Sequence, residues 1–241
     1  MQALDAAVQS ELHAAQLDHS LWTYRDHDVS ATKDATYVNY DTPQGSLRRL
    51  ILLGGQPIPA DARQEESARI DQFVNDPSEQ SKQHKADAHD DSQAASMLRM
   101  LPKAFIWSVS NETPEYITLD YHPNPAFDPP DTEAHVMGTM AGQMIIVRNG
   151  NRIRTLRGYL TQEVKIGYGF LGHLNQGGTF DVERREVAPG FWEITETRVH
   201  IGGRALLFKT IGQQEDEVKT DWKPSPAHSL REAEDLLRDA H

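Results

Sequence analysis

The chain has 241 residues, of which 38% are hydrophobic, so it can bury a sizeable core in one large domain or two small ones. Its 36 acidic residues outnumber its 24 basic residues, and the net charge of −12 argues against binding to nucleic acid, whose phosphates need clustered basic residues. The absence of cysteine excludes disulfides, thiolate zinc sites and a cysteine nucleophile. The sequence also contains no run of about 18 apolar residues, so it predicts no transmembrane helix.

The N-terminal part predicts a helix followed by strands. Leu4, Val8 and Leu12 recur at helical spacing, which predicts an amphipathic N-terminal helix over residues 1–18. No signal peptide is visible, which leaves either a cytoplasmic protein or a mature segment whose export signal has been removed. Strand-like stretches follow at residues 22–41 and 46–53, on either side of a Pro-Gln-Gly turn.

Residues 59–101 differ in composition and predict a helical insertion, or lid, between two parts of one sheet. A break is expected at Asn75-Asp76-Pro77, and Pro102 is expected to stop the last helix. Between them lies a polar run that suggests a solvated acidic helix, with a metal site as the alternative; its His and Asp residues are His84, Asp87, His89, Asp90 and Asp91.

The second half predicts an antiparallel meander over residues 134–219, preceded by two strands and a proline-rich loop. Asn149-Gly150 favours a two-residue type I′ turn, and Pro189-Gly190 favours a second hairpin. Gly202-Gly203 is expected to lead into a strand from Arg204 to Val218. A C-terminal helix over residues 227–240 completes a single domain.

Local motifs of catalysis do not stand out. The sequence lacks Gly-x-Ser-x-Gly, and its glycine-dense stretch, residues 167–178, lacks the end of a phosphate loop. That stretch predicts a bend, with direct ligand contact as the alternative. The Glu and Arg residues between 183 and 198 predict cross-strand ion pairs on a solvated face. We therefore expect no catalytic residue, no metal and no cofactor.

The apolar side chains of the meander and of the strands before it form the core by default. A large curved sheet with few helices also leaves room for an apolar ligand, as barrel-like sheets often do. The candidate ligand-binding residues are Phe105, Trp107, Ile145, Leu156, Phe170, Leu171, Phe180, Trp192, Leu206 and Phe208.

Several motifs carry a family resemblance. The segments at residues 121–130, 142–146, 169–180 and 204–209 resemble a family of uncharacterised bacterial exported proteins, and the resemblance extends over about residues 22–222. That family is similar in strand order to the lipoprotein carriers LolA and LolB and to related lipid-binding half-barrels. The resemblance implies a mainly β (α+β) fold, an incomplete, strongly curved antiparallel β-barrel with helices covering the open side. It also implies export to the periplasm, although no lipobox cysteine is present.

These observations favour a non-catalytic periplasmic binding or carrier protein that holds a lipid acyl chain, or the lipid of a lipoprotein, in a hydrophobic half-barrel cavity. The first alternative is a cell-envelope interaction or sensor protein of the same fold, with an envelope protein as partner and no small-molecule ligand. The second is a hydrolase or metal enzyme. A packed interior would favour the interaction protein, because a carrier needs a cavity.

Overall fold

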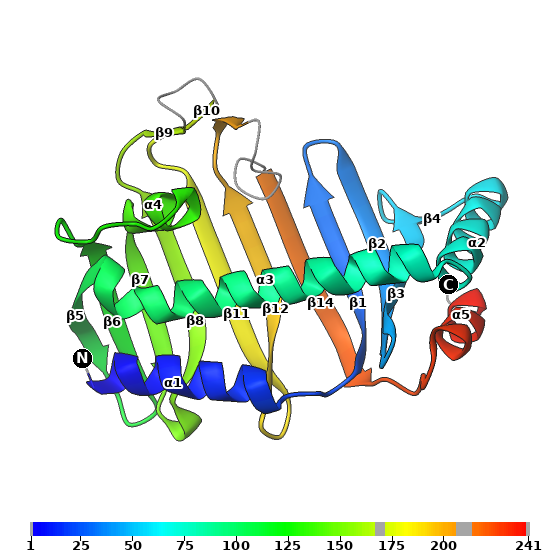
Figure 1. The fold of residues 1–241 in the computed structure, drawn as a ribbon, viewed down its shortest axis with the longest axis horizontal. Coiled ribbons are helices and arrows are strands. Elements are labelled where there is room, and N and C mark those ends of the chain that lie inside the picture. The colour runs from blue at the N-terminus through cyan, green and yellow to red at the C-terminus, as the bar shows by residue number, and fades with distance from the viewer. Residues whose placement is uncertain (1, 167–171, 206–213, 240–241) are drawn as a thin grey trace. The chain divides into compact units, whose positions relative to one another are not determined.

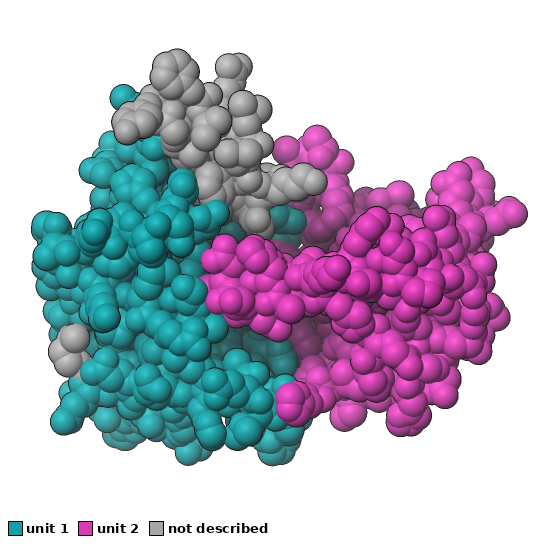
Figure 2. All heavy atoms as spheres, in the orientation of Figure 1, with its two compact units in different colours: residues 1–18, 94–216 teal, residues 19–93, 217–241 magenta. Residues whose placement is uncertain are grey.

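The computed structural model describes residues 2–166, 172–205 and 214–239. Contacts divide the chain into two compact units, which Figure 2 shows in different colours. Unit 1 comprises residues 1–18 and 94–216, and unit 2 comprises residues 19–93 and 217–241. The single domain expected from the sequence stays a prediction.

Within the described residues the fold is α+β, with an 11-stranded antiparallel sheet, a 3-stranded sheet and five α-helices (Figure 1). The strands of the large sheet, in order, are β4 (Gln56–Pro57), β3 (Gly45–Leu53), β2 (Lys33–Thr42), β1 (Trp22–Ser30), β14 (Gln214–Pro224), β12 (Phe191–His200), β11 (Thr179–Ala188), β8 (Arg152–Leu160), β7 (Met140–Val147), β6 (Tyr116–Pro123) and β5 (Phe105–Glu112). The small sheet consists of β13 (Gly203–Ala205), β10 (Gly172–Leu174) and β9 (Val164–Ile166). The helices are α1 (Gln2–Leu17), α2 (Ala60–Val74), α3 (Pro77–Ala104), α4 (Thr132–Gly138) and α5 (Leu230–Arg238).

The sheet corrects the prediction of a strongly curved half-barrel. Its strand order has two ends, β4 and β5, so the sheet is open. Within unit 1, strands β5 to β12 lie side by side without curling into a barrel (Figure 1). The predicted α+β fold with an antiparallel sheet is confirmed. The predicted strong curvature of that sheet is wrong. Closure depends on strand tilt and on stagger of the register, and neither is encoded in the turns and alternation that predict the strands.

Unit 1 is built on one face of its strands, which we call the inner face. The buried side of α1 supplies Leu4, Val8 and Leu12, and the end of α3 adds Leu101. They pack on alternate residues of the strands, among them Met144, which is 0% exposed. The opposite face, which we call the outer face, carries polar side chains such as Arg157 and Arg198 together with the exposed Ile106. This two-sided pattern is what a half-buried antiparallel sheet requires.

Unit 2 has its own core on β2 and β3. Leu47 packs with Ile70 of α2 and with Leu230 and Leu237 of α5. Helix α5 begins where the sequence provides a cap, since the backbone amide of Glu232 donates to Ser229 Oγ over 3.2 Å. The predicted C-terminal helix therefore forms where a cap and an apolar face coincide.

The predicted helical insertion is present as α2 and α3, and the break falls at residues 75–76. Helix α3 then runs through the polar stretch, where His84, Asp87 and Asp91 are exposed. The prediction that Pro102 stops this helix is wrong, because the helix continues to Ala104 and β5 begins at the next residue. A proline in the last turn removes a single hydrogen bond, which the adjoining elements can offset.

Of the two predicted hairpin turns, one forms as expected and the other is longer than expected. Ala188 pairs with Phe191 and Gly190 has φ +85°, so the Pro189-Gly190 hairpin is confirmed. The Asn149-Gly150 turn is longer than predicted. Val147 pairs with Arg152, and the connection contains a 3-10 turn with positive φ at Gly150 and Asn151. A four-residue loop built in this way is the next commonest hairpin connection.

The strand expected from Arg204 to Val218 is not continuous. Its beginning forms β13, which pairs with β10 of the small sheet, and its end belongs to β14 of the large sheet. Residues 206–213 lie outside the described residues, as do residues 167–171 of the glycine-dense stretch.

Candidate functional site

The structure places six of the ten predicted ligand-binding residues. Four of them belong to the apolar cluster on the inner face of unit 1, namely Phe105, Trp107, Leu156 and Phe180. Two do not: Ile145 points to the outer face, between the inward-pointing Met144 and Ile146, and Trp192 lies beside the Arg152 guanidinium at 5.8 Å. The other predicted residues lie outside the described residues: Phe170, Leu171, Leu206 and Phe208.

One row of cross-strand partners organises the inner face. The row runs from β5 to β12 through Trp107, Tyr121, Gly142, Gly158, Phe180 and Val199. Its two central positions are glycines, and the side chains of Tyr121 and Phe180 occupy the space over Gly158. A Cβ on Gly158 would lie 2.3 Å from Tyr121 Oη and 2.9 Å from Phe180 Cε1. Both aromatic side chains therefore fold toward the middle of the row.

An aromatic group holds the end of α3 at the β5 edge. The Phe105 and Tyr121 ring centroids are 4.6 Å apart, and those of Trp107 and Tyr121 are 5.0 Å apart. Trp107 Nε1 donates a hydrogen bond to the Leu101 oxygen over 3.0 Å. Burial raises the pKa of the Tyr121 hydroxyl, so this group stays neutral and acts as a donor.

Coverage of the inner face decreases along the sheet. Leu119 and Met144 on β6 and β7 are buried, whereas their neighbours in the same row, Leu156 on β8 and Val182 on β11, are half-buried. Phe180 and Val199 in the adjacent row are half-buried as well. We call these four side chains, Leu156, Phe180, Val182 and Val199, the apolar strip. Leu156, Phe180 and Val199 pack against the core cluster, and Val182 extends their surface into a region that solvent reaches.

Two members of the apolar strip, Val182 and Val199, were missed in the sequence. Val182 follows Phe180 at the two-residue spacing of one strand face, so alternation alone could have identified it. Val199 depends on the register of β12 against β11, which places it opposite Phe180. Register is set by pairing and not by composition.

Helix α1 is fastened to the inner face by a buried carboxylate. Glu11 is 4% exposed and pairs with Arg152 at 3.0 Å and with Arg184 at 2.5 Å. Its Oε1 also accepts the backbone amide of Ile153 over 2.7 Å. Burial alone would raise the pKa of Glu11, but the hydrogen bond from Arg152 and the charge of Arg184 outweigh it and lower this pKa.

This contact refines the predicted ion pairs of β11 and β12. Arg185 and Arg198 do bind Glu196, at 3.1 Å and 2.6 Å, on the outer face. Arg184 instead reaches Glu11, because the register shifts between Glu183 and Arg184. A β-bulge of this kind re-aims a side chain, and sequence alternation does not reveal it.

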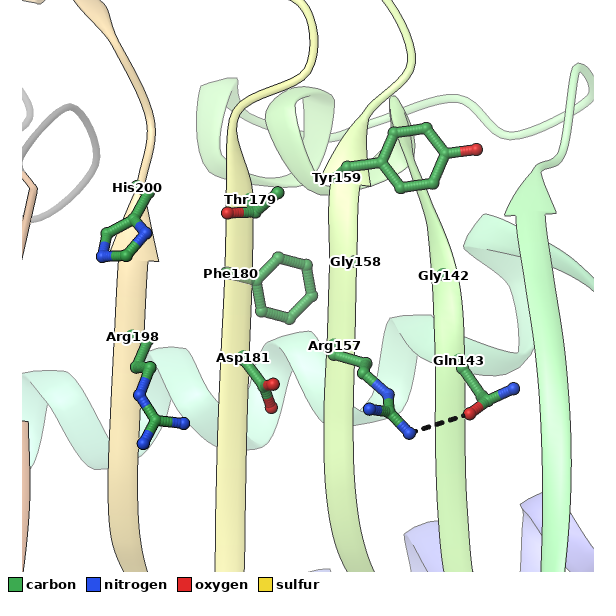
Figure 3. Close-up of a pocket in the computed structure, with 10 residues that line it drawn as sticks. All are labelled: Gly142, Gln143, Arg157, Gly158, Tyr159, Thr179, Phe180, Asp181, Arg198 and His200. Carbon is green, nitrogen blue, oxygen red and sulfur yellow. Dashed lines mark hydrogen bonds between the residues drawn. The ribbon is translucent and has the colours of Figure 1, made fainter. Parts of the chain in front are cut away.

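The outer face of unit 1 holds an open depression of about 490 Å³, which Figure 3 shows in close-up. Its lining includes side chains from two neighbouring rows on β7, β8, β11 and β12, and also the Phe180 ring of the apolar strip. One row is Gln143, Arg157, Asp181 and Arg198, and the other includes Tyr159, Thr179 and His200. The backbone at Gly142 and Gly158 lies between these side chains.

Most charged groups around the depression are anchored. Arg157 Nη2 donates to Gln143 Oε1 over 3.0 Å, and Gln143 Nε2 donates to Asp120 Oδ1 over 2.9 Å. His200 Nε2 lies 2.9 Å from Asp216 Oδ1. Asp181 differs, since among the described residues its carboxylate has no hydrogen bond or ion pair, although it faces Arg157 and Arg198 in register.

Within the residues that the structure describes, no group of three or more His, Asp or Glu side chains could hold a metal ion. In the same residues, no helix is long and apolar enough to cross a membrane. The arrangement thus offers two surfaces for binding in unit 1: the apolar strip on the inner face and the depression on the outer face. Comparison of the chain with protein-family models, with curated proteins and with solved structures finds no match.

Proposed function

We propose that the chain is a non-catalytic binding protein that holds an acyl chain of a lipid or lipoprotein against the apolar strip of unit 1. The observation that supports this proposal is the decrease in coverage across one apolar row. Met144 is 0% exposed, and its neighbours Leu156 and Val182 in that row are half-buried. A core that ends in a half-covered apolar surface gives an acyl chain a place to lie.

The energetics favour such a ligand. Each CH₂ removed from water contributes about 0.8 kcal/mol, so several methylene groups on the strip are needed to offset the cost of association. The strip runs across β8, β11 and β12, perpendicular to the strands. Neighbouring strands lie about 4.8 Å apart, so the strip is roughly 10 Å long, which suits a segment of extended acyl chain.

The end of α3 is the proposed cover. In unit 1, Ala95, Leu98 and Leu101 of this helix belong to the same cluster as Leu156, Phe180 and Val199. Ala95 and Leu98 are half-buried, whereas Trp107 holds Leu101, so the part of α3 before Leu101 is the part proposed to move. The periplasm is the proposed location, which rests on the family resemblance of the sequence.

A second candidate function is that of an envelope interaction protein. It is supported by the tight packing of the deep core, where Leu4, Ile146 and Leu160 are fully buried. In this alternative the apolar strip contacts a protein partner instead of an acyl chain. The two candidates differ in whether a free lipid binds.

Binding of a fluorescent long-chain fatty acid to single variants tests the proposal. Val182→Glu places a charge on the strip and is expected to weaken binding at least about tenfold, because an ionised group costs far more than an apolar one to cover. The matched control is Ile106→Glu, since Ile106 is 45% exposed on the outer face. Equal affinity of the two folded variants would contradict the proposal, and binding by neither variant nor parent would favour the interaction protein.

A further inference from the structure

The outer face of unit 1 carries features that the acyl-binding proposal does not use. The depression there combines charged and hydrogen-bonding side chains with the apolar surface of the Phe180 and Tyr159 rings. It lies on the opposite side of the same strands from the apolar strip, because side chains alternate between faces. A ligand of the depression therefore needs a different chemistry.

Asp181 is the central group of the depression. Figure 3 shows its carboxylate between the guanidinium groups of Arg157 and Arg198, and both are its cross-strand partners. Each of these arginines already donates to another acceptor, Gln143 for Arg157 and Glu196 for Arg198. The row thus presents donor, acceptor and donor in succession, at about the 4.8 Å spacing of adjacent strands.

Two further side chains complete the surface. Tyr159 is 48% exposed and lies opposite Thr179, whose hydroxyl group also faces solvent. A Tyr ring offers an apolar face beside a polar tip, and a hydroxyl group both donates and accepts. His200 lies opposite Thr179 on the other side and is fixed by Asp216.

This combination selects among ligand classes. A simple anion would meet the Asp181 carboxylate, which repels it, and a cation would meet two guanidinium groups. An apolar ligand would leave these charges without solvent. A polyhydroxylated ring satisfies all of them, because its hydroxyls donate to Asp181 and accept from Arg157 and Arg198, while its apolar C–H face can lie on Tyr159.

We propose that the depression formed by Gln143, Arg157, Tyr159, Thr179, Asp181 and Arg198 is a binding site for a saccharide. The volume of about 490 Å³ is in the range of small-molecule sites and accommodates one or two sugar rings. Phe180 contributes to both the apolar strip and the lining of the depression. The six side chains of the proposed site do not belong to the strip, so their substitution tests saccharide binding separately from acyl binding.

The test is an array of neutral and sulfated oligosaccharides probed with the labelled 241-residue chain. We expect binding to a subset of the neutral oligosaccharides. Tyr159→Ala and Asp181→Asn should each weaken that signal at least about tenfold, which corresponds to the loss of one or two good contacts. Ile106→Ala, on the same face but outside the depression, should leave it unchanged, and circular dichroism verifies that each variant is folded.

Three results would overturn the proposal. The first is binding to no oligosaccharide on the array. The second is binding that both Tyr159→Ala and Asp181→Asn retain, which would place the sugar elsewhere. The third is binding that is confined to sulfated oligosaccharides and strengthened by Asp181→Asn. Removal of the carboxylate strengthens the binding of an anion and weakens the binding of a neutral sugar.

Discussion

The hydroxyl of Tyr121 on β6 donates a hydrogen bond to the backbone oxygen of Arg157 on β8, 3.1 Å away. The strand between them, β7, contributes Gly142 to this row, so the Tyr121 side chain can reach across it. A Cβ on Gly142 would lie 2.0 Å from that same Arg157 oxygen. The close approach of β7 and β8 at this point therefore requires glycine.

This relationship predicts that adding a side chain at Gly158 destabilises the folded state. Gly158→Ala places a methyl group 2.3 Å from Tyr121 Oη and is expected to lower the free energy of unfolding by about 2–3 kcal/mol through overpacking. Urea denaturation measures this. Tyr121→Phe removes the hydroxyl group that meets the methyl, so the double variant should lose less stability than the sum of the single variants. Strict additivity would show that the two residues do not meet.

The carboxylate of Glu11 gives a second prediction. Glu11→Ala leaves Arg152 and Arg184 without their shared partner and the Ile153 amide without an acceptor, so the free energy of unfolding should fall by about 3–5 kcal/mol. Gln9→Ala, at an exposed position of the same helix, is the control and should change it by less than about 0.5 kcal/mol. A small loss for both variants would mean that α1 is held by its apolar face alone.

The same carboxylate contributes to acid stability. Because the folded-state pKa of Glu11 is lower than its ordinary value of 4.5, its contribution is present above that value and is lost as the pH falls through the folded-state pKa. Glu11→Gln should therefore flatten the acid limb of the stability curve. An unchanged difference between parent and variant from pH 7 to pH 3 would contradict this assignment.

Asp26 in unit 2 predicts the opposite pH dependence. Burial raises the pKa of Asp26 from 3.8 to about 6, and the nearby Glu217 carboxylate adds to this effect. The charge of Lys219 opposes it. The folded state then binds the proton more tightly than the unfolded state, so this residue's contribution to stability decreases as the pH rises from about 4 to about 6. Asp28 and Arg48 also face Asp26, with smaller effects.

Asp26→Asn tests this assignment. The amide removes the buried charge and should raise the free energy of unfolding at pH 8 by on the order of 2 kcal/mol, with no gain at pH 4. Denaturation midpoints of parent and variant across this range provide the measurement. A gain that is the same at both pH values would show that ionisation of Asp26 is not the cause.

The sequence predicts the strands better than it predicts their arrangement. Turn residues such as Pro189-Gly190 and alternation such as Phe180 and Val182 are local signals, and they identify strands well. Curvature, the division of the segment after Gly203 between two sheets, and the bulge that sends Arg184 to Glu11 all depend on register. Register is a property of pairs of strands, which no single stretch contains.

The candidate sites divide in the same way. The apolar strip could be anticipated in part, because Leu156 and Phe180 are conspicuous in polar surroundings. The depression could not, since Arg157, Asp181 and Arg198 each read as a solvated charge until the pairing of β8, β11 and β12 brings them into one row. Two predicted contacts, Ile145 and Trp192, do not join the inner-face cluster, because apolar character does not specify the face to which a side chain points.

Native mass spectrometry of the purified chain, before and after extraction with organic solvent, tests the acyl-binding proposal most directly. We expect a lipid-sized adduct that extraction removes and that added fatty acid or phospholipid restores, with a weaker adduct for Val182→Glu than for Ile106→Glu. A clean mass for the chain alone, with no uptake of added fatty acid or phospholipid, would contradict the account and leave the apolar strip as a surface for a protein partner.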